Sequence, residues 1–352
     1  MPTRVAINGF GRVGRAALRT AHQRSLELEF VAVNDLAASD QLEYLLQHDS
    51  VYGRFDAELR RSADSLTVDG HELTLLHEPD PMRLPWRELD VDVVLECTGR
   101  FRDREGAAKH LLAGARKVVV SAPMKDADAT VVLGVNFDEA YDPDCHDVIS
   151  NASCTTNCLA PVAKVLHESV GIRHGLMTTI HAYTGDQRLV DLPHKDLRRA
   201  RAAALNLIPT TTGAAKAIGL VIPELAGKLH GFAVRAPVPT GSLVDLTIEA
   251  NRETSADELN ALFHWHSDVG PLQGILDYSE AALVSSDIVG SPYSAVFDAP
   301  LTTVVDGAQV KVVAWYDNEW GYSNRLVELA AKVAAGPALV GTTVTTGEVV
   351  VA

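Results

Sequence analysis

A glycine pattern near the start of the chain constrains its fold more than any other feature. The sequence Gly9-Phe-Gly11-Arg-Val-Gly14 follows an apolar run at residues 4–7, which predicts a strand, and opens residues 12–24, which have helical spacing. In such a unit the glycines permit a tight turn, close approach of the backbone to a pyrophosphate, and close packing of helix on strand. The N–H groups at the helix start would face the anion. The pattern predicts a dinucleotide-binding α/β unit.

An acidic residue after the second strand supports this interpretation. Residues 30–33 form the next apolar run, and Asp35 follows Gly14 by about 20 residues, the spacing at which a carboxylate hydrogen-bonds an adenosine ribose. The same carboxylate would repel the 2′-phosphate of NADP, and Leu36 beside it offers no cation. We therefore expect NAD rather than NADP.

Three more β-rich runs, at residues 91–95, 117–120 and 129–133, alternate with amphipathic stretches. This rhythm is typical of a Rossmann-type, doubly wound parallel sheet. Ligands bind at the carboxyl ends of such strands, where Thr98, Gly99 and Ser121 stand. The alternative for these residues is an ordinary passage from strand to loop.

The second half of the sequence does not continue the alternation of strands and helices. An irregular segment covers residues 183–206, and residues 243–250 and 310–316 have the appearance of antiparallel strands. We predict an NAD-binding domain at 1–153 and an α+β catalytic domain with a mostly antiparallel sheet at 154–316. A C-terminal helix at about 317–335 would pack back on the first domain, and the tail at 336–352 stays unassigned.

Net charge and hydropathy exclude several classes of partner. The 352 residues include 31 Lys and Arg against 46 Asp and Glu, a formal charge of −15 that repels nucleic acid and anionic lipid. No apolar run approaches the roughly 20 residues of a membrane span, and no signal-peptide segment follows Met1. We expect a cytoplasmic protein with no nucleic-acid or membrane partner.

The four cysteines fit neither a disulfide framework nor a zinc site. Ser153 is a candidate N-cap that would place Cys154 in the first turn of a helix, where the helix field lowers the pKa of a thiol from its free value of about 8.5. Cys154 would then be partly thiolate near neutral pH. The alternative is a cysteine that packs as a small apolar side chain. We expect that structural role for Cys158 and no chemical role for Cys97 and Cys145.

A metal site is not expected. His264 and His266 flank Trp265, but a capping box at Ser255 and Glu258 starts a helix there. Residues two apart on a helix point to nearly opposite sides, so the two imidazoles would not share a metal ion.

Four segments together resemble phosphorylating glyceraldehyde-3-phosphate dehydrogenase. They are Ile7-Asn-Gly-Phe-Gly-Arg-Val-Gly14, Ser150-Asn-Ala-Ser-Cys-Thr-Thr-Asn-Cys158, Ile208-Pro-Thr-Thr-Thr-Gly-Ala-Ala-Lys216 and Trp315-Tyr-Asp-Asn-Glu-Trp-Gly-Tyr-Ser-Asn324. The resemblance runs from about residue 4 to residue 335. It implies oxidation of D-glyceraldehyde 3-phosphate with NAD in glycolysis or gluconeogenesis, and it implies a homotetramer.

The resemblance also assigns the chemistry. It implies that Cys154 attacks the aldehyde to form a hemithioacetal, that His181 activates the thiol as acid and base, and that hydride passes to the nicotinamide. Inorganic phosphate then cleaves the resulting thioester to 1,3-bisphosphoglycerate. The residues alone do not match any one of the 13 histidines to Cys154, so this pairing rests on the resemblance.

Binding roles follow from the same resemblance. Thr184 and Arg235 would hold the phosphate of the substrate, and Arg199 would assist one of the anions. The attacking phosphate would be held by Ser153, Thr155, Thr212 and Gly213. The cofactor would contact Gly9, Gly11, Arg12, Val13, Asp35, Thr98, Gly99, Ser121 and Asn318, the last of these at the nicotinamide carboxamide.

Some residues depart from the family pattern. Pro79 stands where an arginine often contacts adenine, and Gly185 resembles forms that use NADP, whereas Leu36 and Pro193 match NAD-specific members. Thr240-Gly-Ser242 replaces a commoner Asn-Val-Ser and leaves the shape of the substrate-phosphate pocket open.

Two alternative functions remain at this stage. One is erythrose-4-phosphate dehydrogenase, whose thioester is hydrolysed by water and which the segment Pro85-Trp-Arg-Glu-Leu89 resembles. The other is a redox-sensing or interaction protein on the same fold, because a reactive Cys154 thiolate would also be a target of oxidation.

Overall fold

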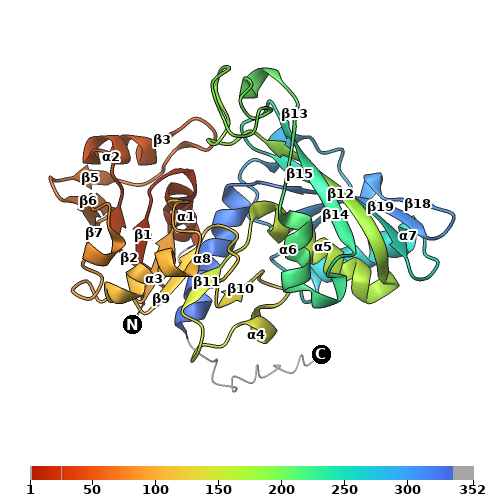
Figure 1. Ribbon diagram of the computed structural model, residues 1–352, viewed down its shortest axis with the longest axis horizontal. Coiled ribbons are helices and arrows are strands. Elements are labelled where there is room, and N and C mark those ends of the chain that lie inside the picture. Colours follow the sequence, from red (N-terminus) through yellow and green to blue (C-terminus); the bar gives the residue numbers. More distant parts are fainter. Residues whose placement is uncertain (1, 25, 336–352) are drawn as a thin grey trace, which may run out of the picture.

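The computed structural model describes residues 2–24 and 26–335, which form two β-sheets side by side (Figure 1). The first sheet has the strand order β10-β11-β9-β8-β1-β2-β7-β6-β5. Its strands are β1 (Thr3–Asn8), β2 (Leu28–Asn34), β5 (Leu59–Arg61), β6 (Ser65–Val68), β7 (His71–Leu76), β8 (Val93–Glu96), β9 (Lys117–Val120), β10 (Ala129–Thr130) and β11 (Val148–Ser150). The helices of this half are α1 (Arg12–Arg24), α2 (Ser39–Gln47), α3 (Arg104–Leu112) and α4 (Phe137–Ala140), and a small β3–β4 hairpin (His48–Asp49, Gly53–Arg54) stands apart.

Strand β1 lies in the middle of this sheet and pairs in parallel with β2 on one side and β8 on the other. The strands that follow in the sequence are therefore added first on one side of β1 and then on the other. Such a switch point opens a crevice at the carboxyl ends of the strands, so the predicted doubly wound sheet is confirmed. The sheet is not parallel throughout: β7 pairs in parallel with β2, but β6 pairs antiparallel with β7 and β5 antiparallel with β6, an edge that the sequence did not predict. Of the predicted strand at 129–133, only β10 (Ala129–Thr130) pairs with a neighbouring strand. The N–H of Val132 donates to the Asn136 side chain at 2.8 Å instead.

The second sheet has the order β13-β14-β12-β15-β19-β17-β16, with β18 beside β19. Its strands are β12 (Ile172–Ala182), β13 (Ile208–Thr210), β14 (Leu229–Ala236), β15 (Ser242–Ala250), β16 (Leu276–Ser279), β17 (Ala295–Asp298), β18 (Thr303–Val305) and β19 (Gln309–Tyr316). Its helices are α5 (Cys154–Val170), α6 (Ala214–Val221) and α7 (Ala256–Asp268). The predicted antiparallel pairing of the last long strands is confirmed between β15 and β19, while β12 and β14 pair in parallel.

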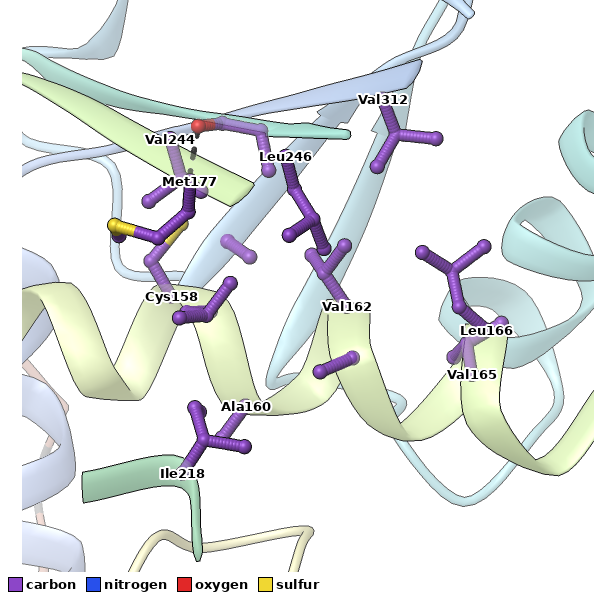
Figure 2. Packing of buried hydrophobic residues seen from close by; sticks show 14 of the residues in the cluster. Cys158, Ala160, Val162, Val165, Leu166, Met177, Ile218, Val244, Leu246 and Val312 are labelled. Atoms are coloured by element: carbon purple, nitrogen blue, oxygen red, sulfur yellow. Dashed lines mark hydrogen bonds between the residues drawn. The ribbon is translucent and has the colours of Figure 1, made fainter. Parts of the chain in front are cut away.

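Helix α5 is buried along nearly its whole length and is the centre of the second core. One side of it, with Cys158, Val162 and Leu166, faces the sheet, as Figure 2 shows, and Ala160 faces α6 on another side. This packing buries Cys158 completely, as expected for a structural cysteine, and it holds the first turn of α5 against the ends of the strands.

Helix α8 (Trp320–Ala334) comes after the second sheet in the chain but packs against α1, β1, β8 and β9 of the first (Figure 1). Its apolar side chains belong to the core of the first sheet, where Leu326 and Leu329 are fully buried. The domain limits at 1–153 and 154–316 stay predictions, and the tail at 336–352 lies outside the described residues.

Residues 2–24 and 26–335 contain neither a membrane-spanning helix nor a metal-ligand cluster. No helix in this part of the chain is long and apolar enough to cross a bilayer. Within the same residues no three His, Cys, Asp or Glu side chains are grouped so that they could hold a metal ion. His264 is exposed and His266 is buried, on opposite sides of α7.

The core around α7 gives a direct test of the fold. Phe263 is fully buried and stacks on Phe297 with ring centroids 3.8 Å apart. Truncation of Phe263 to Ala should lower the free energy of unfolding by about 3–5 kcal/mol because it leaves a cavity. Trp265→Ala, on the exposed side of the same helix, should change it by less than about 0.5 kcal/mol. Urea denaturation followed by circular dichroism measures both, and equal effects would contradict the packing described.

Candidate active site

The first turn of α5 carries Cys154. The Ser153 side chain accepts a hydrogen bond from the backbone N–H of Thr156 at 3.1 Å, so the predicted N-cap is confirmed. The turn before it is tight, with Ala152 at a φ of 51°. The helix therefore begins at the cysteine, with backbone N–H groups of its first turn beside the thiol.

His181 stands at the end of β12 and faces the same thiol. Its Nε2 lies 3.4 Å from Cys154 Sγ, while its Nδ1 lies 2.6 Å from the carbonyl oxygen of Ala182. An Nη of Arg235, which only donates, also lies 3.0 Å from Nδ1, but the shorter contact of Nδ1 is with the carbonyl, which only accepts. A proton on Nδ1 leaves the Nε2 lone pair facing the sulfur. Burial and the charge of Arg235 lower the pKa of His181 to about 3, so the imidazole is neutral near pH 7.

The expectation that helix α5 makes Cys154 partly thiolate near neutral pH is wrong for this arrangement. Burial raises the pKa of the thiol above its ordinary value, although the charge of Arg235 and hydrogen bonds from Thr155 act in the opposite direction. The helix field is a local effect that the sequence reveals, whereas desolvation depends on how the second core closes over the residue. The pair at rest is thus a thiol beside a neutral imidazole.

A cluster of polar side chains lies on the far side of His181. One Nη of Arg235 is 3.0 Å from Thr184 Oγ1 and 3.1 Å from the Ala182 carbonyl oxygen, and the buried Nε has no partner among the described residues. Burial lowers the pKa of this guanidinium, and it forms no ion pair within 4.0 Å in that part of the chain. An unpaired cation beside a hydroxyl is suited to a phosphate group.

Asp186 is a member of this cluster that the sequence reading missed. Its carboxylate accepts hydrogen bonds from Thr184 Oγ1 and from the guanidinium of Arg199. Burial acts to raise its pKa, but these donors and the two arginine charges outweigh burial and lower it. Arg199 also donates to Thr210 Oγ1 at 2.9 Å. The only signal in the sequence was an acidic residue two positions after Thr184.

The residues expected at the attacking phosphate lie in two places. Ser153 and Thr155 belong to the start of α5, where the Thr155 hydroxyl lies 2.9 Å from that of Tyr316. Thr212 and Gly213 stand before α6, and Thr212 Oγ1 accepts from the backbone N–H of Ala214 at 3.2 Å. Within the described residues no hydrogen bond joins this second pair to the cysteine or the histidine.

A cleft of about 250 Å³ opens at the carboxyl ends of β1, β2 and β8. Gly9, Gly11, Asp35 and Thr98 line it, together with Asn8, Asn34, Leu36, Glu78, Pro79, Cys97, Arg100 and Phe101. The other expected cofactor residues, Arg12, Val13, Gly99, Ser121 and Asn318, lie outside this lining.

The glycine loop fits a dinucleotide. A Cβ atom on Gly9 would lie 2.5 Å from the backbone N of Thr98, and one on Gly14 would lie 2.3 Å from the carbonyl oxygen of Gly9. A Cβ on Gly11 would meet nothing within 4 Å, which leaves room for a pyrophosphate to approach the backbone. Asp35 accepts the N–H of Phe10 at 2.8 Å, which holds its carboxylate at the cleft.

The Arg12 side chain does not point to a free anion site. It forms ion pairs with Asp49 and with Glu319, which precedes α8. These carboxylates outweigh the effect of burial and raise the pKa of Arg12 further above its ordinary value. A contact from Arg12 to the pyrophosphate would therefore come from its backbone at the helix start.

Asn318 is buried beyond the end of β19. Its Oδ1 accepts a hydrogen bond from the hydroxyl of Ser242 at 2.9 Å and lies 3.2 Å from that of Thr240, so its Nδ2 group is left to donate. The Thr240 hydroxyl has one proton, and its nearer acceptor is Asp317, at 2.9 Å. The departure at 240–242, which left the shape of the substrate-phosphate pocket open, thus places two hydroxyls beside the amide of Asn318.

Two family models match the chain. The glyceraldehyde 3-phosphate dehydrogenase NAD binding domain matches residues 3–104, and the C-terminal domain of the same enzyme matches residues 153–318. Curated relatives match over nearly the full length. Glyceraldehyde-3-phosphate dehydrogenases of Streptomyces coelicolor and Geobacillus stearothermophilus are each 57% identical, over 333 and 335 residues, which is 95% of this chain and 99% of each relative.

A further relative, glyceraldehyde-3-phosphate dehydrogenase 1 of Bacillus subtilis, is 55% identical over 334 residues. Both halves of the structure are thus matched, the cleft by the NAD-binding model and the Cys154–His181 pair by the C-terminal model. The chain belongs to the glyceraldehyde-3-phosphate dehydrogenase family and is an NAD-dependent oxidoreductase.

Proposed function

We propose that the protein oxidises D-glyceraldehyde 3-phosphate to 1,3-bisphosphoglycerate, with inorganic phosphate as the acyl acceptor. The observation that carries the proposal is the 3.4 Å approach of His181 Nε2 to Cys154 Sγ at the start of α5, with the unpaired Arg235 guanidinium bonded to the next residue, Ala182. A thiol with its base supports covalent capture of an aldehyde, and the adjoining cation supports a phosphorylated one.

The proton movements follow from the resting state of the pair. As Sγ attacks the aldehyde carbon, its proton passes to Nε2 of His181 and then to the new oxyanion, which gives the hemithioacetal. Backbone N–H groups in the first turn of α5 can stabilise that oxyanion. NAD, when bound in the cleft, supplies the acceptor for the hydride that leaves this carbon. His181 takes the hydroxyl proton in that step, and a thioester on Cys154 remains.

We assign the substrate phosphate and the attacking phosphate to two separate groups of donors. We assign the phosphate of the substrate to Thr184 and Arg235, with Arg199 beside them, because the hydroxyl and the two guanidiniums form one connected cluster. We assign the attacking phosphate to Ser153, Thr155, Thr212 and Gly213 at the starts of α5 and α6. Phosphate attack on the thioester carbon would release the acyl phosphate and the Cys154 thiolate, which regains its proton from His181.

The cofactor assignments rest on the cleft and its neighbours. Gly9, Gly11, Asp35 and Thr98 line the cleft, and Asn318 presents an oriented amide outside it. Asp35 lines the cleft next to Leu36, and a carboxylate at this place favours NAD over NADP. Arg12, Val13, Gly99 and Ser121 are assigned to this group through the family resemblance and through their places beside the same strand ends.

We also propose a homotetramer in the cytoplasm. The segment from Arg188 to Leu207 exposes several apolar side chains, of which Leu197 and Leu205 are each 82% exposed, and such a patch is typical of a protein interface. All four cysteines are free, which fits a reducing compartment.

The reaction is tested by NAD reduction at 340 nm with glyceraldehyde 3-phosphate, with and without phosphate. Cys154→Ser should lower kcat by about 10⁴, because a hydroxyl is a far weaker nucleophile, and His181→Asn by about 10² to 10⁴. Cys145→Ser, at an exposed cysteine, should leave kcat unchanged. Steady turnover without phosphate, or preference for erythrose 4-phosphate, would favour the hydrolysing relative. Full activity of Cys154→Ser would refute the mechanism.

The neutral state of His181 predicts a pH dependence of stability. Its pKa is about 3 in the folded protein against 6.5 ordinarily, so below pH 6.5 the unfolded chain binds a proton that the folded chain does not. Stability should therefore fall as pH drops from 6.5 toward 3. His181→Gln should remove up to about 1.4 kcal/mol of this loss per pH unit. Chemical denaturation between pH 7 and 4.5 measures it, and parallel curves for both proteins would contradict the assignment.

The interface proposal is tested by sedimentation velocity at micromolar concentration. The unaltered protein should sediment as a tetramer. Replacement of Leu197 and Leu205 by Asp should shift it to smaller species, because burying an unpaired carboxylate in an interface is unfavourable. Leu112→Asp, at an exposed leucine of α3, should leave the tetramer intact. A monomer for the unaltered chain would refute the proposal.

A further inference from the structure

A buried polar chain runs beneath the cofactor cleft and takes no part in the mechanism above. It joins Trp86, His110, Glu96, Asn8 and Asn34, all of which are at most 4% exposed. Three of these residues are the last of their strands, since Asn8 ends β1, Asn34 ends β2 and Glu96 ends β8. Buried polar groups are costly unless they are fully hydrogen-bonded, so the donors and acceptors here can be counted one by one.

The indole N–H of Trp86 can only donate. It lies 2.9 Å from Nδ1 of His110, so Nδ1 must accept and carries no proton. The imidazole is therefore neutral, with its proton on Nε2, which lies 3.1 Å from Oε2 of Glu96. Trp86 thus fixes the His110 tautomer that donates to Glu96.

Three further donors converge on Glu96. Asn8 Nδ2 donates to Oε2 at 2.6 Å, and both the backbone N–H, at 2.8 Å, and the hydroxyl of Thr98 donate to Oε1. Asn8 is held in this orientation because its Oδ1 accepts from Asn34 Nδ2 at 2.7 Å. The N–H groups of Asn8 and His110 at Oε2 and the backbone N–H of Thr98 at Oε1 cannot accept, so a carboxylate satisfies every donor, whereas an amide would set an N–H against an N–H at either position.

This series of hydrogen bonds ends at residues that line the cleft. Asn34 exchanges hydrogen bonds of 2.9 Å with the backbone N–H and C=O of Glu78, and Asn8, Asn34, Glu78 and Thr98 all line the cleft. The backbone at Thr98 is also the surface that leaves no room for a Cβ on Gly9. One carboxylate therefore holds the loop after β8 against the glycine loop after β1.

We infer that Glu96, kept as a carboxylate acceptor by Trp86 and His110, is a positioning residue that sets the two loops of the cofactor cleft and thereby the affinity for NAD and NADH. The inference rests on the proposed use of this cleft for the dinucleotide. Glu96 touches neither the thiol nor the substrate-phosphate cluster in the structure, so its effect falls on cofactor binding and not on the chemical step.

The test uses the full chain and measures the dissociation constant of NADH by fluorescence titration, next to KM for NAD and kcat. Glu96→Gln places an amide N–H against at least one N–H in either orientation of the amide, so the dissociation constant and KM for NAD should rise about tenfold, which is about 1.4 kcal/mol. At saturating NAD, kcat should stay within about twofold. Glu88→Gln, at an exposed glutamate, should change none of the three.

A second variant tests the tautomer argument. Trp86→Phe removes the indole donor, so the His110 proton can move to Nδ1 and Nε2 can accept. In Glu96→Gln this change should recover at least threefold of the lost NADH affinity, whereas alone it should weaken NADH binding about threefold. A structural role for Trp86 predicts additive losses instead. If Glu96→Gln does not fold, Trp86→Phe alone decides.

The outcomes separate this inference from the proposed function. Unaltered protein that binds no NADH refutes both. Binding by the unaltered protein together with an unchanged dissociation constant in Glu96→Gln refutes only the inference, as does a loss of kcat at unchanged affinity. Additive losses in the double variant, or wild-type affinity in Trp86→Phe, refute the proposed tautomer control.

Discussion

The placement of helix α5 is the constraint on which the catalytic centre depends. This helix is apolar on nearly all sides, so it is stable only when the second sheet and α6 cover it. Covering it fixes the position of its first turn, and Ser153 caps that turn, so Cys154 has little freedom relative to the end of β12. The 3.4 Å contact between thiol and imidazole is therefore set by packing over the length of the helix and not by the two residues alone.

The same packing determines the protonation of the pair. A helix start favours a thiolate, and the charge of Arg235 does so too, but desolvation by the core opposes both. Burial also removes the imidazolium form of His181. The resting site therefore holds no ion pair, and the base is ready to accept a proton when the sulfur attacks. Charge appears only as substrate arrives, next to donors that are already in place.

How much could be predicted from the sequence depended on the range of each interaction. The glycine loop, Asp35 and the Ser153 cap are local, because each is specified within a few residues or one strand-helix-strand unit, and all are found where expected. Contacts such as Asn8 with Glu96, or Thr240 with Asn318, join residues 88 and 78 positions apart. Their partners are decided by which strand ends become neighbours, which local spacing does not reveal.

Arg12 shows that a residue whose role seems clear from its local sequence can have distant partners that change that role. A cation at the start of a helix beside a predicted pyrophosphate suggests an ionic contact, yet its guanidinium is held by Asp49 and Glu319. These residues lie 37 and 307 positions away, so the pairing depends on α8 returning to the first sheet. The arginine joins the glycine loop to the segment that carries Asn318, and the backbone N–H groups of α1 are left as the donors for an anion.

The negative charge of the chain makes these local donors necessary for the binding of anions. A protein with a formal charge of −15 repels anionic ligands at long range, yet the cofactor, the substrate and inorganic phosphate are all anions. Salt screens charges beyond about 8 Å at physiological ionic strength, so the decisive interactions are the local ones. Locally the donors are helix starts, hydroxyls and an Arg235 guanidinium without an ion pair in the described residues. Specific attraction thus comes from a few oriented groups, while the overall charge discourages binding of larger polyanions.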